Sequence, residues 1–190
     1  MRRGIATGLI KARLQPTDVV LCGLGSTGRA WREHHALNPT YYASDPMGMG
    51  PAVALGLALA QPNRGVVLLE GDGDLSMNLG ALLAIAGAAP PNLRIAVFYN
   101  RRYETGGGQP LAAAGKISFA AIARGAGFPW AAEIDDGHAA EPVLDELFAR
   151  TGPGLVVFPI EAEDSPYPPA GDLAQSEERI LFMRALHGPS

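Results

Sequence analysis

Residues 66–74 read VVLLEGDGD, and residues 94–100 read RIAVFYN. Both stretches are short apolar runs, which is typical of strands buried on both faces, and both end in residues that favour turns. The mostly apolar stretch between them, from about Leu75 to Gly87, predicts a helix. A strand, a helix and a second strand in this order predict a βαβ unit with parallel strands. Asp72 and Asn100 therefore follow the carboxyl ends of two neighbouring strands, at the edge of an α/β sheet where ligands usually bind.

The same alternation of strands and helices continues along the whole chain. Strands are expected at residues 18–22, 41–43, 66–69, 94–99, 130–133 and 155–160. Helices are expected at residues 4–14, 27–35, 48–60, 75–87, 118–125 and 139–150, with a last helix that Asp172 or Ser176 caps and that reaches about His187. This order predicts the α/β class, with a mostly parallel sheet and helices on both faces. We expect one doubly wound domain over residues 1–190, in which residues 161–190 form a Pro-rich irregular segment and the C-terminal helix.

Asp72 and Asn100 carry the oxygen donors that a hard cation such as Mg2+ binds. Asp72 offers a carboxylate and Asn100 an amide oxygen, and a backbone carbonyl in the loop after Asn100 is a third candidate donor. Gly71 and Gly73 let the backbone approach a ligand closely, and the free N–H groups of a helix starting near Leu75 favour an anion at the same place. Gly-Asp-Gly alone is a common turn, and an Asn at a strand end is often only a turn former, but the joint pattern is more specific. The sequence therefore predicts a site for Mg2+ and a diphosphate group.

The stretch from Gly71 to Gln109 resembles the cofactor-binding signature of thiamine diphosphate enzymes, which begins with Gly-Asp-Gly and ends with Asn-Asn. Residues 47–60 extend the likeness. In the β subunits, or C-terminal domains, of sulfopyruvate and phosphonopyruvate decarboxylases, the loop reads Asp-Asn, then a Tyr, then Thr-Gly-Gly-Gln. Tyr99-Asn100, Tyr103 and residues 105–109 stand in those places here. The resemblance covers roughly residues 15–160 and implies the thiamine diphosphate-binding fold.

Carried over position by position, the resemblance implies roles for particular residues. Asp72, Asn100 and the backbone carbonyl of Arg102 would bind Mg2+, while the amides of Gly73 and Asp74 would hold the diphosphate. Met47 would lie under the thiamine and bend it into its reactive shape, and the carbonyl of Asp45 would meet the aminopyrimidine. The complete set of implied cofactor-binding residues is Asp45, Met47, Gly48, Gly71, Gly73, Asp74, Leu75, Tyr103 and Thr105.

The sequence departs from the family pattern at three places. Tyr99 replaces the first residue of the Asn pair, and Asp45-Pro46 replaces a more usual Gly-Ser. The loop after Thr105 has three glycines where two are usual, so the register of the likeness is not fixed beyond that residue.

The resemblance also implies an activity and a partner. The family members are lyases that decarboxylate a small 2-oxo acid with thiamine diphosphate and Mg2+. Their catalytic Glu contacts the pyrimidine ring and comes from a separate pyrimidine-binding domain, for which the 190 residues leave no room. We therefore expect a β-type subunit, with no catalytic residue of its own, that joins an α-type subunit in a heterotetramer or larger assembly. Arg101 and Arg102 are candidates for binding the anionic tail of the substrate, because guanidinium suits sulfonate, phosphonate or carboxylate.

Other interpretations remain open from the sequence. The alternatives are a subunit of an acetolactate synthase-like enzyme or of a 2-oxo acid oxidoreductase, and a cofactor-binding module without activity, against which the intact Asp72 and Asn100 argue. Residues 23–28 read GLGSTG, a G-x-G-x-x-G after a strand, and Asp45 lies where a dinucleotide fold places its ribose-binding acid. This motif is weak alone, and the helix that follows it is short and polar.

Composition excludes several classes of function. The net charge of −4, without a long basic run, argues against nucleic acid as a partner. The single cysteine, Cys22, cannot form an internal disulfide or a thiolate cluster. No signal peptide or membrane-spanning run is recognisable, so the expected location is the cytoplasm.

Overall fold

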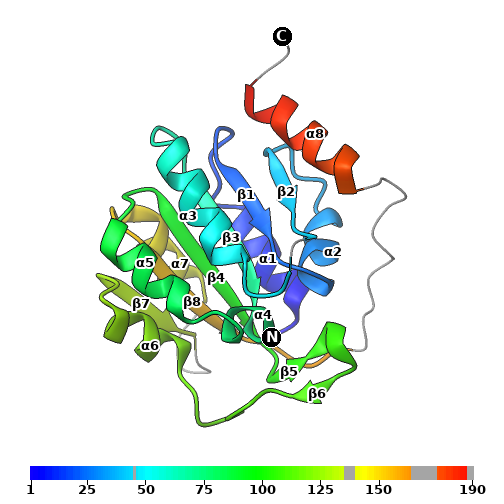
Figure 1. Cartoon of the computed structure of the whole chain (residues 1–190), viewed down its shortest axis with the longest axis vertical. Coiled ribbons are helices and arrows are strands. Elements are labelled where there is room, and N and C mark those ends of the chain that lie inside the picture. The colour runs from blue at the N-terminus through cyan, green and yellow to red at the C-terminus, as the bar shows by residue number, and fades with distance from the viewer. Residues whose placement is uncertain (45, 135–139, 164–174, 188–190) are drawn as a thin grey trace.

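The computed structural model of the chain describes residues 1–44, 46–134, 140–163 and 175–187. Its centre is a six-stranded sheet in the order β2-β1-β3-β4-β8-β7, in which every neighbouring pair of strands is parallel (Figure 1). The strands are β1 (Val19–Cys22), β2 (Thr40–Tyr42), β3 (Val66–Gly71), β4 (Leu93–Tyr99), β7 (Trp130–Glu133) and β8 (Gly154–Pro159). The four central strands are buried along almost their whole length, which explains why they read as continuous apolar runs. The predicted α/β fold with a mostly parallel sheet is confirmed.

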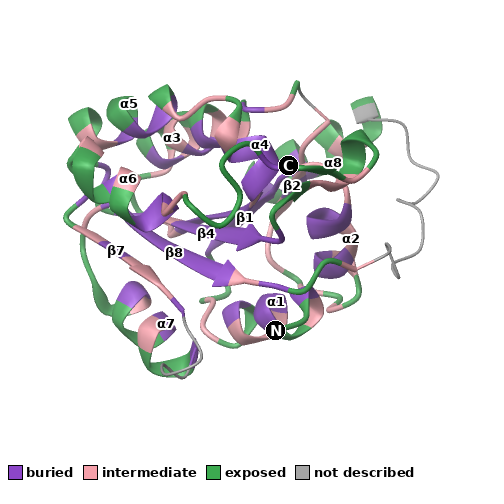
Figure 2. Ribbon diagram, turned by 90° about the horizontal axis from the view of Figure 1, so that it is seen from below, coloured by how far each residue is buried: buried purple, intermediate pink, exposed green. Residues whose placement is uncertain are grey.

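Helices cover both faces of this sheet in two layers (Figure 2). One layer consists of α3 (Gly50–Ala60), α5 (Gly80–Ala88) and α6 (Phe119–Ala126), and the other of α1 (Arg3–Lys11), α2 (Ser26–Arg32) and α7 (Ala140–Ala149). The buried side chains separate accordingly into two apolar clusters, one on each face of the sheet. No helix in the described ranges is long and apolar enough to cross a membrane.

The helix predicted from Leu75 to Gly87 is two helices. α4 (Asp72–Ser76) begins at the aspartate of the Gly-Asp-Gly turn, and α5 follows after a turn at residues 77–79. The side chain of Asn78 lies in this turn, and its Nδ2 donates a hydrogen bond to the backbone oxygen of Gly48 at 3.1 Å. The prediction of one helix was wrong because the apolar pattern continues through residues 77–79, where the chain turns and Asn78 contacts the distant loop at Gly48.

The ends of the chain differ from the prediction in smaller ways. α1 ends at Lys11 instead of residue 14. The last helix, α8 (Gln175–His187), packs on the edge strand β2, where the rings of Tyr41 and Phe182 are 5.4 Å apart. Asp172, one of the two predicted caps of this helix, lies outside the described residues, as does most of the expected irregular segment.

Candidate functional site

The order of the strands places a crevice at one edge of the sheet. β2 and β3 lie on opposite sides of β1, so the loops that follow β1 and β3 leave the sheet in different directions. The loops after β1, β3 and β4 meet there around a cavity of about 40 Å3. Its lining residues are Arg3, Leu24, Ser26, Thr27, Met47, Gly71, Asp72, Gly73, Asp74, Asn100, Arg102, Tyr103, Glu104 and Thr105.

Asp72 joins the ends of two strands at this cavity. Its Oδ1 accepts a hydrogen bond from the N–H of Gly73 at 2.9 Å, and its Oδ2 accepts one from the N–H of Arg101 at 2.7 Å. Burial raises the pKa of Asp72 to about 6, while the two backbone hydrogen bonds and the charge of Arg3 act in the opposite direction. The carboxylate is therefore held in one orientation by backbone groups at the ends of β3 and β4.

Asn100 is held by two contacts of opposite kind. Its Nδ2 donates to Oε2 of Glu104 at 2.7 Å, and its Oδ1 accepts from the N–H of Arg102 at 2.9 Å. Glu104 follows the short strand β5 (Arg102–Tyr103), which pairs with β6 (Gln109–Pro110) in a small hairpin. The sequence pattern predicts a loop in this region and gives no role to Glu104.

The backbone of the hairpin approaches α4 closely. A Cβ added at Gly73 would lie 2.9 Å from the Tyr103 ring and 3.5 Å from the backbone oxygen of Arg102, so only glycine fits there without a shift. The carbonyl of Arg102 thus lies beside Gly73, and Arg102 lines the same cavity as Asp72 and Asn100. A carboxylate, an amide oxygen and a backbone carbonyl are oxygen donors that Mg2+ takes. No cluster of three or more His, Cys, Asp or Glu arranged for a metal occurs in the part of the chain that the structure describes. The mixed oxygen set of Asp72, Asn100 and Arg102 is therefore the candidate metal site.

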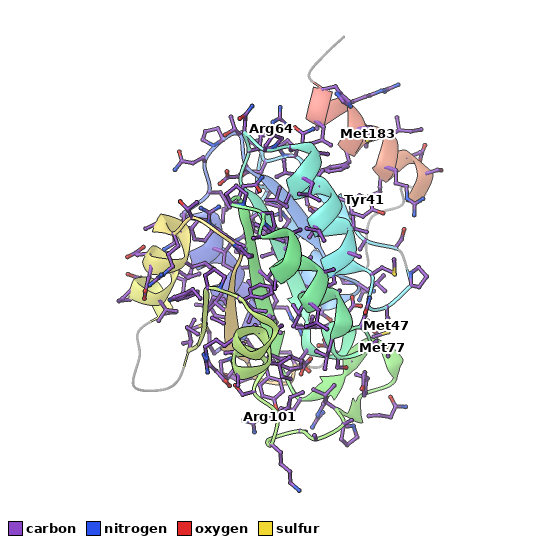
Figure 3. All side chains as sticks on the ribbon, turned by 60° about the vertical axis from the view of Figure 1, so that its left-hand side comes forward. Tyr41, Met47, Arg64, Met77, Arg101 and Met183 are labelled. Carbon is purple, nitrogen blue, oxygen red and sulfur yellow. The ribbon has the colours of Figure 1, made fainter. Side chains whose placement is uncertain are left out.

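A second loop, at residues 46–49, is tied to α4 from the other side. The N–H of Gly48 donates to Oδ1 of Asp74, and the carbonyl of Gly48 accepts from Asn78. Gly48 has a φ of +88°, which favours glycine at this position. These bonds place Met47 in the lining of the cavity, and Figure 3 shows Met47 beside Met77 at the same end of α3 and α5. The carboxylate of Asp74 thus points to Gly48, while its backbone amide belongs to the first turn of α4.

Glu70 lies beneath this site and is completely buried. A Cβ at Gly23 or at Gly50 would collide with its carboxyl group. Burial and the neighbouring carboxyl of Asp74 raise the pKa of Glu70 well above its ordinary value. Its Oε1 accepts from the N–H of Gly71 at 3.0 Å. Glu70 does not line the cavity, so it supports the end of β3 and is no candidate for the catalytic Glu.

The structure brings most of the predicted site residues together. Met47, Gly71, Asp72, Gly73, Asp74, Asn100, Arg102, Tyr103 and Thr105 all line the cavity, and Gly48 is bound to Asp74 directly behind it. Leu75 does not line the cavity, because the turn of α4 directs its side chain into the apolar core, where it is completely buried. Asp45 lies outside the described residues.

The two candidate substrate residues lie in different surroundings. Arg102 lines the cavity, but Arg101 has a φ of +67° and its guanidinium lies over the ring of Tyr99, 5.6 Å from the centroid. Arg101 is exposed and lies at the lower end of the molecule in Figure 3, and it is not among the residues that line the cavity.

Sequence reasoning missed Leu24, Ser26 and Thr27, which come from the G-x-G-x-x-G stretch after β1. Gly25 in this stretch has a φ of +76°, and a Cβ there would collide with the methyl group of Thr105. The motif was a usable signal, because a glycine-rich loop after a parallel strand opens at the ligand-binding edge of the sheet. Arg3 lies far away in the sequence and carried no such signal.

Comparisons with known proteins agree with this geometry. The family described as "Thiamine pyrophosphate enzyme, C-terminal TPP binding domain" matches residues 23–158. The chain is 33% identical over 171 residues to the sulfopyruvate decarboxylase subunit beta of Methanothermobacter thermautotrophicus, covering 90% of this chain and 88% of that protein. It is 30% identical over 149 residues to the phosphonopyruvate decarboxylase of Streptomyces hygroscopicus, covering 78% of this chain but only 37% of that protein.

The fold has solved counterparts as well. The benzoylformate decarboxylase of Polynucleobacter necessarius superposes with a TM-score of 0.74 at 19% identity, covering 90% of this chain and 34% of that chain. At this identity the likeness shows the fold alone. The family match, in contrast, spans well over half of the sequence and includes the loops after β1, β3 and β4. The protein therefore belongs to the thiamine pyrophosphate enzymes, of which it carries the C-terminal thiamine pyrophosphate-binding domain.

Proposed function

We propose that the chain is the β-type subunit of a thiamine diphosphate- and Mg2+-dependent 2-oxo acid decarboxylase of the sulfopyruvate or phosphonopyruvate type. One observation carries this proposal: Asp72, Asn100 and Arg102 line the same cavity. The cavity lies at the edge of the sheet where the strands that follow β1 and β3 lie on opposite sides of that pair of strands. The named decarboxylases are also among the relatives of the chain, one of them over 90% of its length.

The residues of this chain hold and orient the cofactor. Asp72, Asn100 and the carbonyl of Arg102 bind Mg2+, and the amides of Gly73 and Asp74 hold the diphosphate. The ionised form of Asp72 that a cation needs is favoured by the backbone N–H groups of Gly73 and Arg101. When bound, the cofactor supplies the nucleophilic carbon and the electron sink for loss of carbon dioxide from a 2-oxo acid.

The catalytic Glu comes from a partner subunit. A cavity of about 40 Å3 has room for only a few water-sized groups, so most of the thiamine lies outside the surface of this chain. Of the two glutamates nearest the metal ligands, Glu70 is buried beneath the site and Glu104 is hydrogen-bonded to Asn100. The likeness to a protein named as a beta subunit, over 88% of that protein, agrees with a separate α-type partner.

The outer surface of α3 and α5 is suited to this partner. Residues 46–61 and 75–93 contain no charged side chain, although the whole chain is 18% charged. Large apolar side chains are nevertheless exposed along it, including Leu59 at 57% and Leu83 at 62%. This surface starts at Met77, beside the cavity, and continues into an apolar groove of about 640 Å3 between α3 and α8. An uncharged surface of this kind marks a protein interface, and its position places the partner next to the cofactor.

Calorimetric titration of the purified chain with thiamine diphosphate tests the cofactor assignment. We expect binding in the presence of Mg2+ that weakens at least tenfold in D72N, because the amide keeps the shape of Asp72 but loses its charge. D145N is the matched control, since Asp145 is an exposed acid on α7, away from the cavity. Absence of Mg2+-dependent binding, both for the chain alone and with its partner subunit, would overturn the proposal.

Kinetics with the partner subunit test the activity and the substrate residue. We expect the chain alone to be inactive and the mixture to decarboxylate an anionic 2-oxo acid. R102A is expected to raise KM, whereas R101A leaves KM unchanged because Arg101 lies against Tyr99. Decarboxylation at a normal rate by the chain alone would contradict the need for a partner.

A further inference from the structure

A residue outside the family match, Arg3, lines the same cavity as the proposed metal ligands. Arg3 belongs to α1, whereas the match begins at residue 23, yet its side chain lines the cavity and is only 4% exposed. Its Nη2 lies 2.5 Å from Oε2 of Glu104, and its Nη1 lies 3.4 Å from Oε1, so the guanidinium faces the carboxylate with both nitrogens. The hydroxyl of Ser26 donates to Oε1 of the same carboxylate at 2.5 Å. Glu104 is thus held by groups from α1 and α2.

The contact of Glu104 with Asn100 fixes the orientation of an amide. The two ends of an Asn side chain have nearly the same shape but opposite roles, since the nitrogen donates and the oxygen accepts. An ionised carboxylate can only accept, so the donor in the 2.7 Å contact with Glu104 is the nitrogen end of Asn100. The oxygen of Asn100 then faces the other way, where it accepts from the N–H of Arg102.

Arg3 explains why the carboxylate of Glu104 stays in place. A carboxylate that is partly removed from water needs hydrogen bonds and an opposite charge, and Arg3 and Ser26 supply both. The face-to-face contact with a guanidinium also restricts the position of the carboxylate in a way that a single point charge would not.

We propose that Arg3 and Glu104 are a positioning pair that directs the amide oxygen of Asn100 toward the metal and makes α1 part of the cofactor site. This inference rests on the proposed function, in which Asn100 binds Mg2+. Groups that orient a metal ligand in this way commonly contribute ten- to a hundredfold to metal affinity.

Four variants test the role of Glu104 as an orienting group. The measurement is the Mg2+ concentration needed for thiamine diphosphate binding by the purified chain, in wild type, E104Q, N100D and N100D/E104Q. E104Q is expected to raise this concentration about tenfold or more, because a Gln can face Asn100 with either end. In N100D the side chain has oxygen at both ends and needs no orientation, so adding E104Q is expected to cause no loss. A purely structural role for Glu104 predicts the same loss in both backgrounds.

A second measurement needs no cofactor. The side-chain amide protons of Asn100, observed by NMR in the cofactor-free chain, are expected to exchange slowly with water and to give one set of signals. R3M and E104Q are expected to remove this protection. R13M is the matched control, because Arg13 lies just after the same helix and makes a 2.7 Å ion pair with Asp145, away from the site. R13M is expected to leave both the amide signals and the Mg2+ requirement unchanged.

The outcomes separate this inference from the function on which it rests. If the wild type shows no Mg2+-dependent binding, even with its partner, the proposed function fails and the inference fails with it. If the wild type binds and E104Q needs no more Mg2+, or if E104Q causes the same loss in the N100D background, only the inference is overturned. If E104Q does not fold because Arg3 is left buried without a partner, R3M/E104Q removes both charges and is expected to fold with the weakened Mg2+ requirement.

Discussion

The two helical layers of this protein are alike on the inside and different on the outside. Toward the sheet, Leu82 of α5 and Leu144 of α7 are both completely buried. Away from it, α3 and α5 carry no charge, whereas α1 and α7 carry basic and acidic residues. Arg13, just after α1, forms an ion pair with Asp145 of α7. The core needs apolar side chains only on the sides of the helices that face the sheet. The composition of the outward-facing sides therefore indicates whether each layer contacts water or another protein. The α1 side meets water, and the α3 side is the one on which we place the partner subunit.

Two leucine substitutions test whether the sheet-facing sides of the two layers contribute equally to the core. L82A and L144A are each expected to reduce the free energy of unfolding by about 2–5 kcal/mol, because each removes a completely buried leucine side chain and leaves a cavity. Urea unfolding followed by circular dichroism measures both. A loss below about 1 kcal/mol in either variant would mean that its layer contributes little to the core.

The outer difference predicts an unequal response to a new charge. L83E is expected to weaken assembly with the partner subunit at least about 100-fold, since a carboxylate would be buried in an uncharged contact. I5E is the matched control, because Ile5 is exposed to 56% on α1, close to the 62% of Leu83 on α5. Both variants are expected to fold. Equal affinities of the two variants for the partner, measured by sedimentation or calorimetry, would remove α5 from the interface.

The ion pairs of the α1 side are expected to contribute modestly to stability. R13M removes the pair with Asp145, whose side chain is 67% exposed, and we expect a loss of at most about 1 kcal/mol. The methionine keeps the apolar stem of the arginine, so the loss reports the charged end. An unfolding free energy lower by more than about 2 kcal/mol would show that the hydrogen bonds of Arg13 to the carbonyls of Leu9 and Glu141 matter more than its ion pair.

The smallest expected effect concerns pH and again separates the layers. His34 follows α2 and hydrogen-bonds Thr7 of α1 at 2.8 Å, whereas α3 and α5 contain no titratable side chain. Burial lowers the pKa of His34 from its ordinary value of 6.5. Below pH 6.5 the unfolded chain therefore takes up a proton that the folded chain resists, and the native state loses stability on acidification.

H34Q removes this contribution, so the melting temperature of the wild type is expected to fall more than that of H34Q between pH 7.5 and pH 5. Thermal melts at both pH values measure the difference. If the wild type instead gains stability relative to H34Q on acidification, the pKa of His34 is raised by folding and not lowered.

The sequence predicted the central part of the fold well because strands that are buried on both faces leave a plain signal. β3 and β4 were recognised within a few residues of their ends, and the ends of parallel strands must meet at one edge. The gathering of Asp72 and Asn100 at that edge follows from topology. The break between α4 and α5 left no such signal, since the apolar pattern continues through it and the turn is stabilised by the contact between Asn78 and Gly48.

The site was predicted as far as its residues belong to one βαβ unit. In the sequence, Arg3 lies 101 residues before Glu104 and Ser26 lies 78 residues before it. Nothing in the local pattern around Arg3 distinguishes a buried ion pair from an ordinary surface charge. Leu75 was placed against the cofactor from the likeness alone, and the short helix α4 directs it into the core instead.

The enclosure of Glu70 by two glycines restricts the order in which this sequence can change. A Cβ at position 23 or 50 would collide with the Glu70 carboxyl, so neither glycine can be replaced without a shift while that side chain remains. Glu70→Ser would open space toward both glycines at once. A side chain at position 23 or 50 therefore requires the Glu70 carboxyl either to shift or to be lost, and this one carboxyl links three positions that lie on three separate segments of the chain.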